Sequence, residues 1–449
     1  MKKTENSKYI LLLLLIVLAL QPAWSQEGQQ VLRLRPEEAI LKAMEQNLGV
    51  EISRQNQEIS RRNYSLGNAG FLPSVSAAAA RNWSLQNNEQ TDRAGETRQL
   101  QGVRPNNLSY GVAASWRIFD GLGMFHSYER LRLEYEASGL LNQQTINELA
   151  ANVLSTYYQH TLQQQRLELW ENTLELSEQR LRLAKDRYEV GKTSKQEYLS
   201  ALVDYNADRA AQLAQQEALK NTRHQLNRLM GQSPMQVIQT IDTLRADSTL
   251  IRELLLPQPV AQNPEYRASE LQIAASESFV QEQRSRFWPS ISADLGYNFA
   301  RQNNPASFFL FNQTAGFNYG ISASWFLFDG FNTRRNVQIA RIQSQLADLD
   351  RRQLELDLQT SQADAMVAYR TQWQQIDLER ENLEYAQQNA DIAMERYRLG
   401  VTTPLELRVA QQNAQQAELR LLNAVYELKI AEIELMRISG QLVSGYNQR

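Results

Sequence analysis

The segment SYGVAASWRIFDGL at Ser109–Leu122 recurs as NYGISASWFLFDGF at Asn318–Phe331, and this repeat decides the fold. The two copies are offset by 318 − 109 = 209 residues. The same offset carries RYEVGKTSKQEYL, which starts at Arg187, onto RYRLGVTTPLELR, which starts at Arg396. Several motifs in one order at one offset indicate an internal tandem duplication.

A second pair of motifs lies upstream of these copies. FLPSVSAAAA begins at Phe71 and FWPSISADLG begins at Phe287, an offset of 287 − 71 = 216 residues. The first repeat therefore has 216 − 209 = 7 additional residues, which we place in a polar loop at about 86–107. Each repeat is predicted to contain a modest helix (about 36–66 and 262–286), two strands, a very long helix and a return helix.

Apolar and small polar side chains alternate along the second strand of each repeat, which predicts two different strand faces. The apolar face contains Tyr110, Val112 and Trp116 in the first copy, and Tyr319, Ile321 and Trp325 in the second. This face is either the core of a soluble sandwich or the lipid-facing side of a membrane barrel. Four strands cannot close a barrel, because small barrels need about eight, so several chains would have to share it.

A long helix follows each of these strands. Turns at Asp120-Gly121 and Asp329-Gly330 lead into helices at 122–189 and 332–399. The first has 189 − 122 + 1 = 68 residues, or roughly 100 Å at about 1.5 Å per residue, and therefore needs packing partners. Leu167, Leu174, Leu181 and Tyr188 recur every seven residues, and three residues later in each heptad come Trp170, Ser177 and Ala184. This pattern predicts a thin coiled-coil seam with small residues. The helices form either a solvated antiparallel hairpin or a helical wall that faces a channel.

Glycine and threonine mark the end of each long helix. Gly191 and Gly400 suit the left-handed conformation that ends a helix, and the Thr or Ser residues after them suit the cap of the next helix. Each repeat is therefore predicted to form a helical hairpin with a tight tip.

Composition excludes several classes of function. The net charge is −3, without the basic excess typical of nucleic-acid binding, and the chain has no Cys. The three His residues are isolated, and we find no nucleophile-base pair, phosphate-binding glycine loop or metal-ligand cluster. We therefore expect no enzyme activity, no catalytic or metal site and no cofactor.

The N-terminus is typical of a secretory signal peptide. Lys2, Lys3 and Lys8 precede the apolar run Ile10–Leu20, which has 20 − 10 + 1 = 11 residues and is too short to cross a bilayer as a helix. Cleavage is expected after Ser25.

The combined motifs resemble those of the outer-membrane factors of the TolC family. The similarity rests on Leu72-Pro73-Ser74, its counterpart Trp288-Pro289-Ser290, the two Phe-Asp-Gly turns and the two hairpin tips, and it extends from about Pro36 to Gln441. The resemblance implies a mixed α and β membrane protein. Three chains would form a 12-stranded β-barrel in the outer membrane, four strands from each, which continues into a long α-helical coiled-coil tunnel in the periplasm.

The same resemblance implies a function and its partners. The protein would be the passive exit duct of a tripartite efflux or type I secretion system, working as a homotrimer in contact with outer-membrane lipid. It would dock a membrane-fusion adaptor protein and an inner-membrane pump, and export small molecules or polypeptides. The alternative is a periplasmic coiled-coil adaptor or scaffold without a membrane barrel.

The resemblance also implies roles for individual residues. A periplasmic gate would contain Glu406 and its repeat partner Glu197, although Val409 replaces a second acid that some members have. Adaptor-docking tips would contain Val190, Gly191, Thr193, Leu399, Gly400 and Thr402.

These expectations divide the chain as follows. The signal peptide is 1–25, the first repeat 26–231, the equatorial connector 232–261, the second repeat 262–440 and the C-terminal tail 441–449. The first repeat has a strand hairpin at about 72–118, the long helix at 122–189, a tip at 190–194 and a return helix to 230. The second has strands at about 289–327, the long helix at 332–399, a tip at 400–404 and a return helix to 438.

Overall fold

The structure is a computed structural model that describes residues 31–91, 93–244, 246, 260–307, 309–440 and 442. The expected signal peptide lies outside the described residues, as does the expected C-terminal tail apart from Leu442. The described chain divides into two compact units. Unit 1 contains the described residues of Met1–Gln46, Val153–Arg245 and Ile376–Tyr426, and unit 2 those of Asn47–Asn152, Ala246–Gln375 and Glu427–Arg449.

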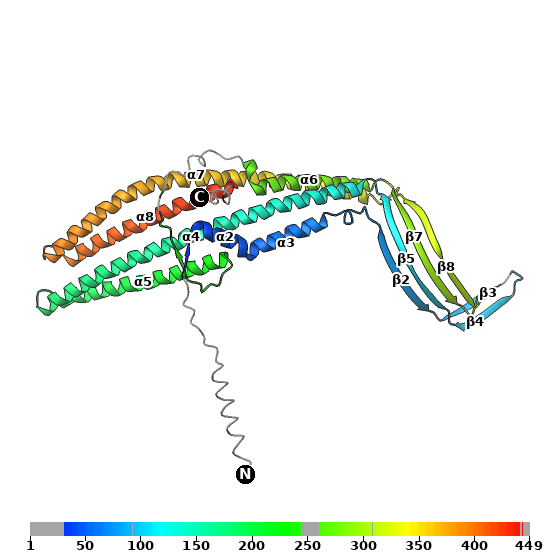
Figure 1. Ribbon diagram of the computed structural model, residues 1–449, viewed down its shortest axis with the longest axis horizontal. Helices are drawn as coiled ribbons and strands as arrows, with labels where there is room; N and C mark the ends of the chain where they lie inside the picture. Colours follow the sequence, from blue (N-terminus) through cyan, green and yellow to red (C-terminus); the bar gives the residue numbers. More distant parts are fainter. Residues whose placement is uncertain are drawn as a thin grey trace, which may run out of the picture. The chain divides into compact units, whose positions relative to one another are not determined.

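Unit 2 contains a curved four-stranded antiparallel sheet (Figure 1). Its strand order is β2 (Ser74–Trp83), β5 (Asn106–Phe119), β7 (Ser290–Asn303) and β8 (Phe311–Ser324). The first repeat supplies β2 and β5, the second supplies β7 and β8, and β5 pairs with β7 between them. Strands β2 and β8 are therefore the two edges of the sheet.

The register places the apolar side chains of all four strands on one face. Val112 pairs with Ala77 on one side and Tyr297 on the other, and Tyr297 pairs with Phe317. Residues that pair directly across strands point to the same side of a sheet. This face also carries Tyr110, Trp116, Tyr319 and Ile321, and Trp325 lies one residue beyond β8.

The apolar face is exposed within the single chain. Tyr319 is 85% and Ile321 is 77% exposed, and Tyr110 and Val112 are about half exposed. The opposite face is polar, and there Ser115 donates a hydrogen bond of 2.7 Å to Asp294. Within the single chain the apolar face is therefore not the buried core that the soluble-sandwich interpretation requires.

The segment between β2 and β5 is a second sheet, so the expectation of a loop at 86–107 is wrong. Strands β3 (Gln86–Thr91) and β4 (Thr97–Val103) form an antiparallel hairpin. Its side chains are mostly polar and exposed, so no apolar alternation marks it in the sequence. Polar contacts replace apolar packing: the Thr91 and Thr97 hydroxyls lie 3.0 Å apart, and Gln99 donates to Glu89 at 3.1 Å.

Matching turns connect the sheet to the long helices α4 (Gly123–Glu189) and α7 (Asn332–Arg398). Asp120 accepts the backbone N–H of Met124 at 3.2 Å, and Asp329 accepts that of Thr333 at 2.7 Å. Gly121 and Gly330 have φ values of 73° and 69°. Gly121 also requires the absence of a side chain, since a Cβ there would lie 2.3 Å from the Ser285 carbonyl oxygen.

The return helices complete two hairpins of equal dimensions. Helix α5 spans Lys195–Leu229 and helix α8 spans Pro404–Ile438. The offset of 209 residues relates both pairs, because 332 − 123 = 209 and 404 − 195 = 209. In the part of the chain that the structure describes, none of the helices has an apolar stretch long enough to cross a membrane.

The buried side of α4 agrees with the predicted seam only in part. Ser177 and Ala184 of the seam are buried, but Leu167, Leu174 and Leu181 are only half-buried and Tyr188 is exposed. Arg180, which lies outside the predicted seam, is buried because polar contacts, described below, hold it against α5 and α8.

The shorter elements also depart from expectation. The predicted helix at 36–66 is two helices, α2 (Pro36–Gln46) and α3 (Leu48–Asn63), because Asn47 caps α3 by accepting the Gly49 N–H at 2.7 Å. Helix α6 (Pro264–Ser285) begins after Asn263, the counterpart of Asn47, since 263 − 47 = 216. Strand β1 (Leu32–Leu34) pairs in parallel with β6 (Ile238–Thr240), so the connector contains a strand, and the 3₁₀ turn η1 (Val260–Gln262) follows.

Candidate functional site

The candidate site lies at the hairpin turns of unit 1, where side chains from both repeats meet. After α4, Gly191 takes a φ of 73°, and the N–H of Lys192 donates to the Arg187 carbonyl at 2.8 Å. After α7, Gly400 takes a φ of 77°, and Val401 donates to the Arg396 carbonyl at 2.9 Å. These are the left-handed turns and back-bonds that end helices.

The turns present an exposed, partly apolar surface. Val190 is 68% and Leu399 is 77% exposed. A Cβ added at Gly191 or Gly400 would meet nothing within 4 Å. The docking residues named above therefore lie at the surface, with Thr193 and Thr402 half-buried beside them.

The two predicted gate residues occupy equivalent positions in helix caps. Ser194 accepts the N–H of Glu197 at 3.3 Å, and Thr403 accepts the N–H of Glu406 at 3.2 Å. The preceding hydroxyls, those of Thr193 and Thr402, donate to the carboxylates of Glu197 and Glu406. A carboxylate in the first turn also interacts favourably with the helix dipole. Both residues thus stabilise their own turn, whatever else they do.

Glu197 additionally binds across to the second hairpin. The hydroxyl of Tyr397 donates to Glu197 Oε1 at 3.0 Å, and the Tyr397 ring is buried. Burial, together with this hydrogen bond, raises the pKa of Tyr397 to about 12, so the phenol remains a neutral donor at physiological pH. The Arg187 guanidinium lies 4.8 Å from the Tyr397 ring centroid and donates to the Tyr397 carbonyl at 2.9 Å.

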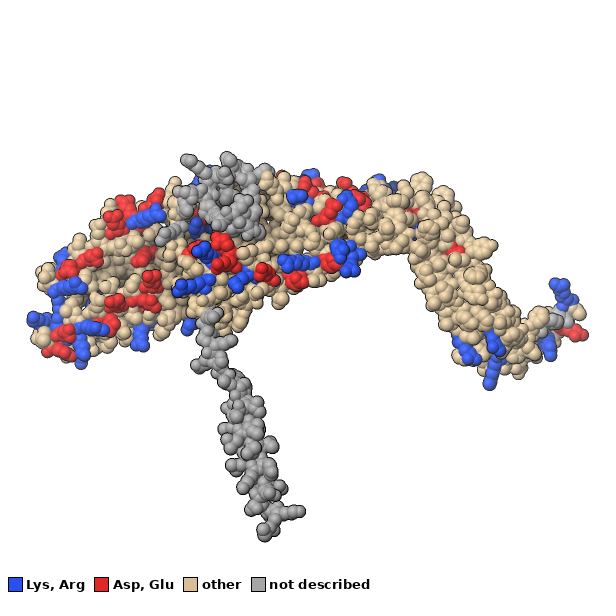
Figure 2. Space-filling model, in the orientation of Figure 1, with Lys and Arg blue, Asp and Glu red and all other residues tan. Residues whose placement is uncertain are grey.

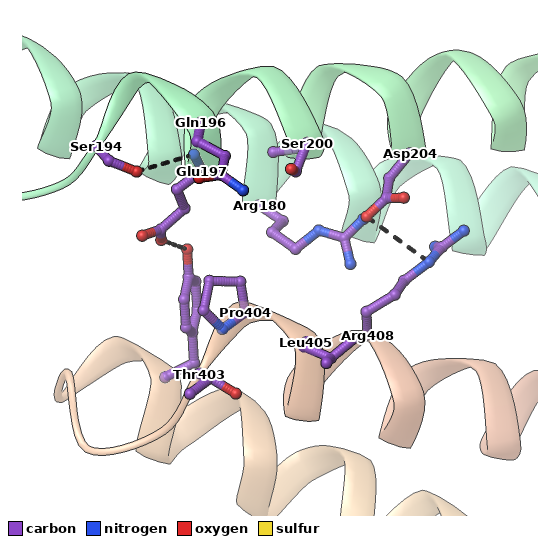
Figure 3. A pocket seen from close by; sticks show the side chains of 12 residues that line it. Arg180, Ser194, Gln196, Glu197, Ser200, Asp204, Thr403, Pro404, Leu405 and Arg408 are labelled. Atoms are coloured by element: carbon purple, nitrogen blue, oxygen red, sulfur yellow. Dashed lines mark hydrogen bonds and ion pairs between the residues drawn. The ribbon is translucent and has the colours of Figure 1, made fainter.

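Behind this contact lies an open pocket of about 420 Å³ (Figure 3). Both repeats line it, as the close-up shows, with Arg180 and the start of α5 on one side and the start of α8 on the other. Its charged lining consists of Arg180, Glu197, Asp204 and Arg408.

A network of four charged side chains joins the two hairpins beside this pocket. Arg180 donates to Asp204 at 2.9 Å, and Arg408 binds both oxygens of Asp208 at 2.8 Å. Ser177 donates to Asp208 as well. Burial lowers the pKa of Arg180, while the hydrogen bonds that Arg408 donates to Asp208 raise the pKa of Arg408. Two cations face two anions, so the network is electrically balanced and serves to hold helices together.

The contacts described above support a structural role for this network. No cluster of three or more His, Asp or Glu side chains in the described ranges is placed to hold a metal ion. The contacts of this site hold the tips of the two hairpins together.

Sequence reasoning did not identify the four network residues, because the repeats are recognised by residues present in both copies and these four are present in only one. The repeat partners of Arg180, Asp204, Asp208 and Arg408 are Asn389, Asn413, Ala417 and Leu199. The available signal was this divergence, a charged residue in one repeat where the other has a neutral one. Tyr397 is duplicated as Tyr188, but Tyr188 is 38% exposed and stacks on Tyr198 instead.

Comparisons with known proteins agree with this architecture. TtgC of Pseudomonas putida, a probable efflux pump outer membrane protein, is 24% identical over 411 residues, which cover 88% of this chain and 80% of TtgC. The cation efflux system protein CusC of Escherichia coli is 22% identical over 406 residues, which cover 89% of this chain and 85% of CusC.

Solved structures share the fold. The outer-membrane channel OprN superposes with a TM-score of 0.75 at 20% identity, covering 90% of this chain and 89% of OprN. The Campylobacter jejuni outer membrane channel CmeC gives a TM-score of 0.75 at 17% identity, covering 90% of this chain and 85% of CmeC. The mixed α and β fold expected from the sequence is thereby confirmed.

A family model settles the assignment. The model described as outer membrane efflux protein matches residues 39–232 and 255–441, which include both repeats. The chain therefore belongs to the outer membrane efflux protein family, whose members are transport channels and not enzymes.

Proposed function

We propose that three copies of this chain form a passive exit duct through the outer membrane, part of a tripartite efflux or type I secretion system. Each copy contributes β2, β5, β7 and β8, which gives 3 × 4 = 12 strands around one barrel. The observation that carries this proposal is the sheet itself. In the described chain its edge strands β2 and β8 pair on one side only, and its apolar face is exposed.

Closure with other copies resolves both features. Unpaired edges expose backbone N–H and C=O groups, which cannot remain unsatisfied in lipid. A closed barrel pairs every edge and directs the apolar face toward lipid, with the polar face toward the lumen. The aromatic side chains Tyr110, Trp116, Tyr319 and Trp325, together with Val112 and Ile321, then contact outer-membrane lipid.

The helical hairpins α4–α5 and α7–α8 extend the duct as a periplasmic tunnel in this proposal. Their exposed tips dock an adaptor protein that couples the duct to an inner-membrane pump, through Val190, Gly191, Thr193, Leu399, Gly400 and Thr402. Glu406 lies exposed in the first turn of α8 and forms a ring of carboxylates at the tunnel entrance when three copies assemble. Glu197 supports this ring from the neighbouring hairpin, through its contact with Tyr397.

The pump selects the cargo in this proposal, and the duct conducts it. Two relatives are named for different cargoes, a toluene efflux pump outer membrane protein and a cation efflux system protein. The turn surfaces and the polar sheet face show no built site for one kind of molecule in the described residues. A substrate-sensitivity panel on a deletion strain identifies the cargo.

Two lysine substitutions at adjacent positions test the barrel. Phe317 lies on the apolar face and is 72% exposed, and Asn318 lies on the opposite face. A lysine facing lipid near the bilayer midplane costs about 2–4 kcal/mol per chain, while a lumen-facing lysine costs little. We expect Phe317→Lys to abolish heat-resistant trimers in the outer-membrane fraction and Asn318→Lys to retain them.

The alternative function gives a different result in the same experiment. A periplasmic adaptor or scaffold would be recovered in the soluble or inner-membrane fraction. Equal trimer yields for the two variants would refute the proposed orientation of the sheet.

A further inference from the structure

Two arginines interrupt the apolar face of the sheet at one level. Arg81 of β2 pairs with Leu108 of β5, and Leu108 pairs on its other side with Arg301 of β7. All three side chains therefore point to the same face. The two arginines flank Leu108 across two strand spacings, roughly 10 Å between Cα atoms. Both are exposed.

Aromatic rings adjoin both guanidinium groups. Arg81 Cζ lies 5.0 Å from the centroid of the Trp83 ring, and Arg301 Cζ lies 4.9 Å from that of Phe311. Arg81 also donates to the Asn106 amide oxygen at 3.4 Å. Neither arginine forms an ion pair with a carboxylate among the residues that the structure describes. Two cations on one face thus have no anion between them.

The level of the arginines matches the outer limit of an apolar band. From Arg301 to Ile291, the first apolar-face residue of β7, the distance is 301 − 291 = 10 residues. At about 3.3 Å per residue and a tilt of about 40°, this length spans roughly 25 Å of membrane, the height of the apolar band in such barrels. Figure 2 shows the visible face of the sheet nearly free of charge, with basic side chains gathered where β3 and β4 leave it.

The strand direction identifies the leaflet. The other end of β5, at Phe119, leads through Asp120 and Gly121 into α4. If α4 extends into the periplasm, as the proposed function requires, the arginines lie at the outer leaflet. The inference below rests on that proposed function.

We propose that Arg81 and Arg301 form a binding site for the phosphate groups of an outer-leaflet glycolipid. A guanidinium group binds phosphate through paired, charge-assisted hydrogen bonds. Trp83 and Phe311 hold the two guanidinium planes at the interface, and the apolar side chains below them contact the acyl chains. One bisphosphorylated headgroup neutralises both arginines, and one site per chain gives three sites per trimer.

Native mass spectrometry of the detergent-purified trimer tests this site, with bisphosphorylated lipid A as the probe. We expect the wild-type protein to bind up to three lipid A molecules per trimer. The Arg81→Gln/Arg301→Gln variant should bind at least 10-fold more weakly. Lipid A without phosphates should bind the wild-type protein weakly, with an affinity no higher than that of intact lipid A for the glutamine variant.

Arg117→Gln is the matched control. Arg117 lies on the same sheet, opposite Ser292 on the polar face, and is also exposed. Its loss should leave lipid A affinity within threefold of the wild type. The Arg81→Lys/Arg301→Lys variant keeps both charges without the paired hydrogen bonds, and should bind with intermediate affinity.

Two results would overturn the inference: equal affinity of the glutamine variant and the wild type, or equal affinity for the two forms of lipid A. Failure of the proposed function looks different, since the wild-type protein would then give no heat-resistant trimer in the outer-membrane fraction. If the glutamine variant forms no trimer, the comparison of the two lipids on the wild-type trimer still decides.

Discussion

The ion pair between Arg408 and Asp208 gives a quantitative test of how the two hairpins are held together. The Asp208 side chain is 5% exposed and accepts two hydrogen bonds of 2.8 Å from Arg408. In the Arg408→Ala variant this carboxylate keeps the Ser177 hydroxyl and loses its bound cation. Removing one partner of a buried ion pair costs about 3–5 kcal/mol.

The lower end of that range applies here. Arg408 is 16% exposed, and the adjoining pocket admits water to the vacated space. We therefore expect about 3 kcal/mol, which is roughly a 100-fold change in the equilibrium for local opening. Amide hydrogen exchange measures this opening directly. Exchange should accelerate by about that factor in α5 around Asp208 and in the first turns of α8.

A less buried ion pair in the same unit provides the control; its carboxylate, Glu379, is 16% exposed. Arg420 binds Glu379 at 3.0 Å but is 50% exposed, so Arg420→Ala should cost less than about 1 kcal/mol. The double variant Arg408→Met/Asp208→Leu removes both charges, and should exchange close to the wild-type rate.

Two outcomes would refute this reasoning. Exchange in Arg408→Ala no faster than in Arg420→Ala would show that the pair does not hold the hairpins together. A double variant as labile as Arg408→Ala would show that lost packing, and not an unpaired charge, causes the effect.

Three further predictions concern single residues. His160 is buried against Thr222, and burial lowers its pKa from 6.5 to about 4. Between pH 6.5 and 4 the unfolded chain therefore binds more protons than the folded chain, and about 3 kcal/mol of stability should be lost as the pH falls through this range. Thermal unfolding at several pH values measures this loss, and His160→Gln should remove it. Gly400→Leu should abolish efflux while trimer level and membrane insertion stay normal. Gly95→Leu in the β3–β4 turn is the control, because Gly95 also has a positive φ, and it should leave efflux intact. A fall in trimer level for Gly400→Leu would count against docking. Glu406→Ala should abolish single-channel block by divalent cations, and unchanged block would refute a carboxylate ring.

The duplication allowed much of the fold to be read from the sequence. Helices α4 and α7 begin and end within about one residue of the expected positions, because each boundary is marked twice. Asp-Gly turns precede both helices, and Gly191 and Gly400 follow them. Left-handed turns at helix ends require particular residue types, so they can be predicted from the sequence.

Features that depend on polar side chains could not be predicted from the pattern of apolar residues. The β3–β4 hairpin lacks an apolar face, so its alternation is invisible to a hydrophobic pattern. The break at Asn47 is a polar helix cap, in which the Asn47 side chain accepts the Gly49 N–H. The buried side of α4 contains Arg180, which a search for apolar heptads assigns to the surface. In each case polar contacts of individual side chains, and not an apolar pattern, decide the structure.

The two hairpins have the same backbone structure, but the residues through which they contact each other differ between the repeats. Turn and cap residues are kept in both copies, because each hairpin needs a left-handed glycine and a capped return helix. Contact residues differ between the two copies. Here the first hairpin presents Asp208 and the second presents Arg408, while their repeat partners are the neutral Ala417 and Leu199. Duplication within a single chain therefore lets both hairpins keep the same turns, while their contact residues diverge into a complementary ion pair that is absent at the repeat-related positions.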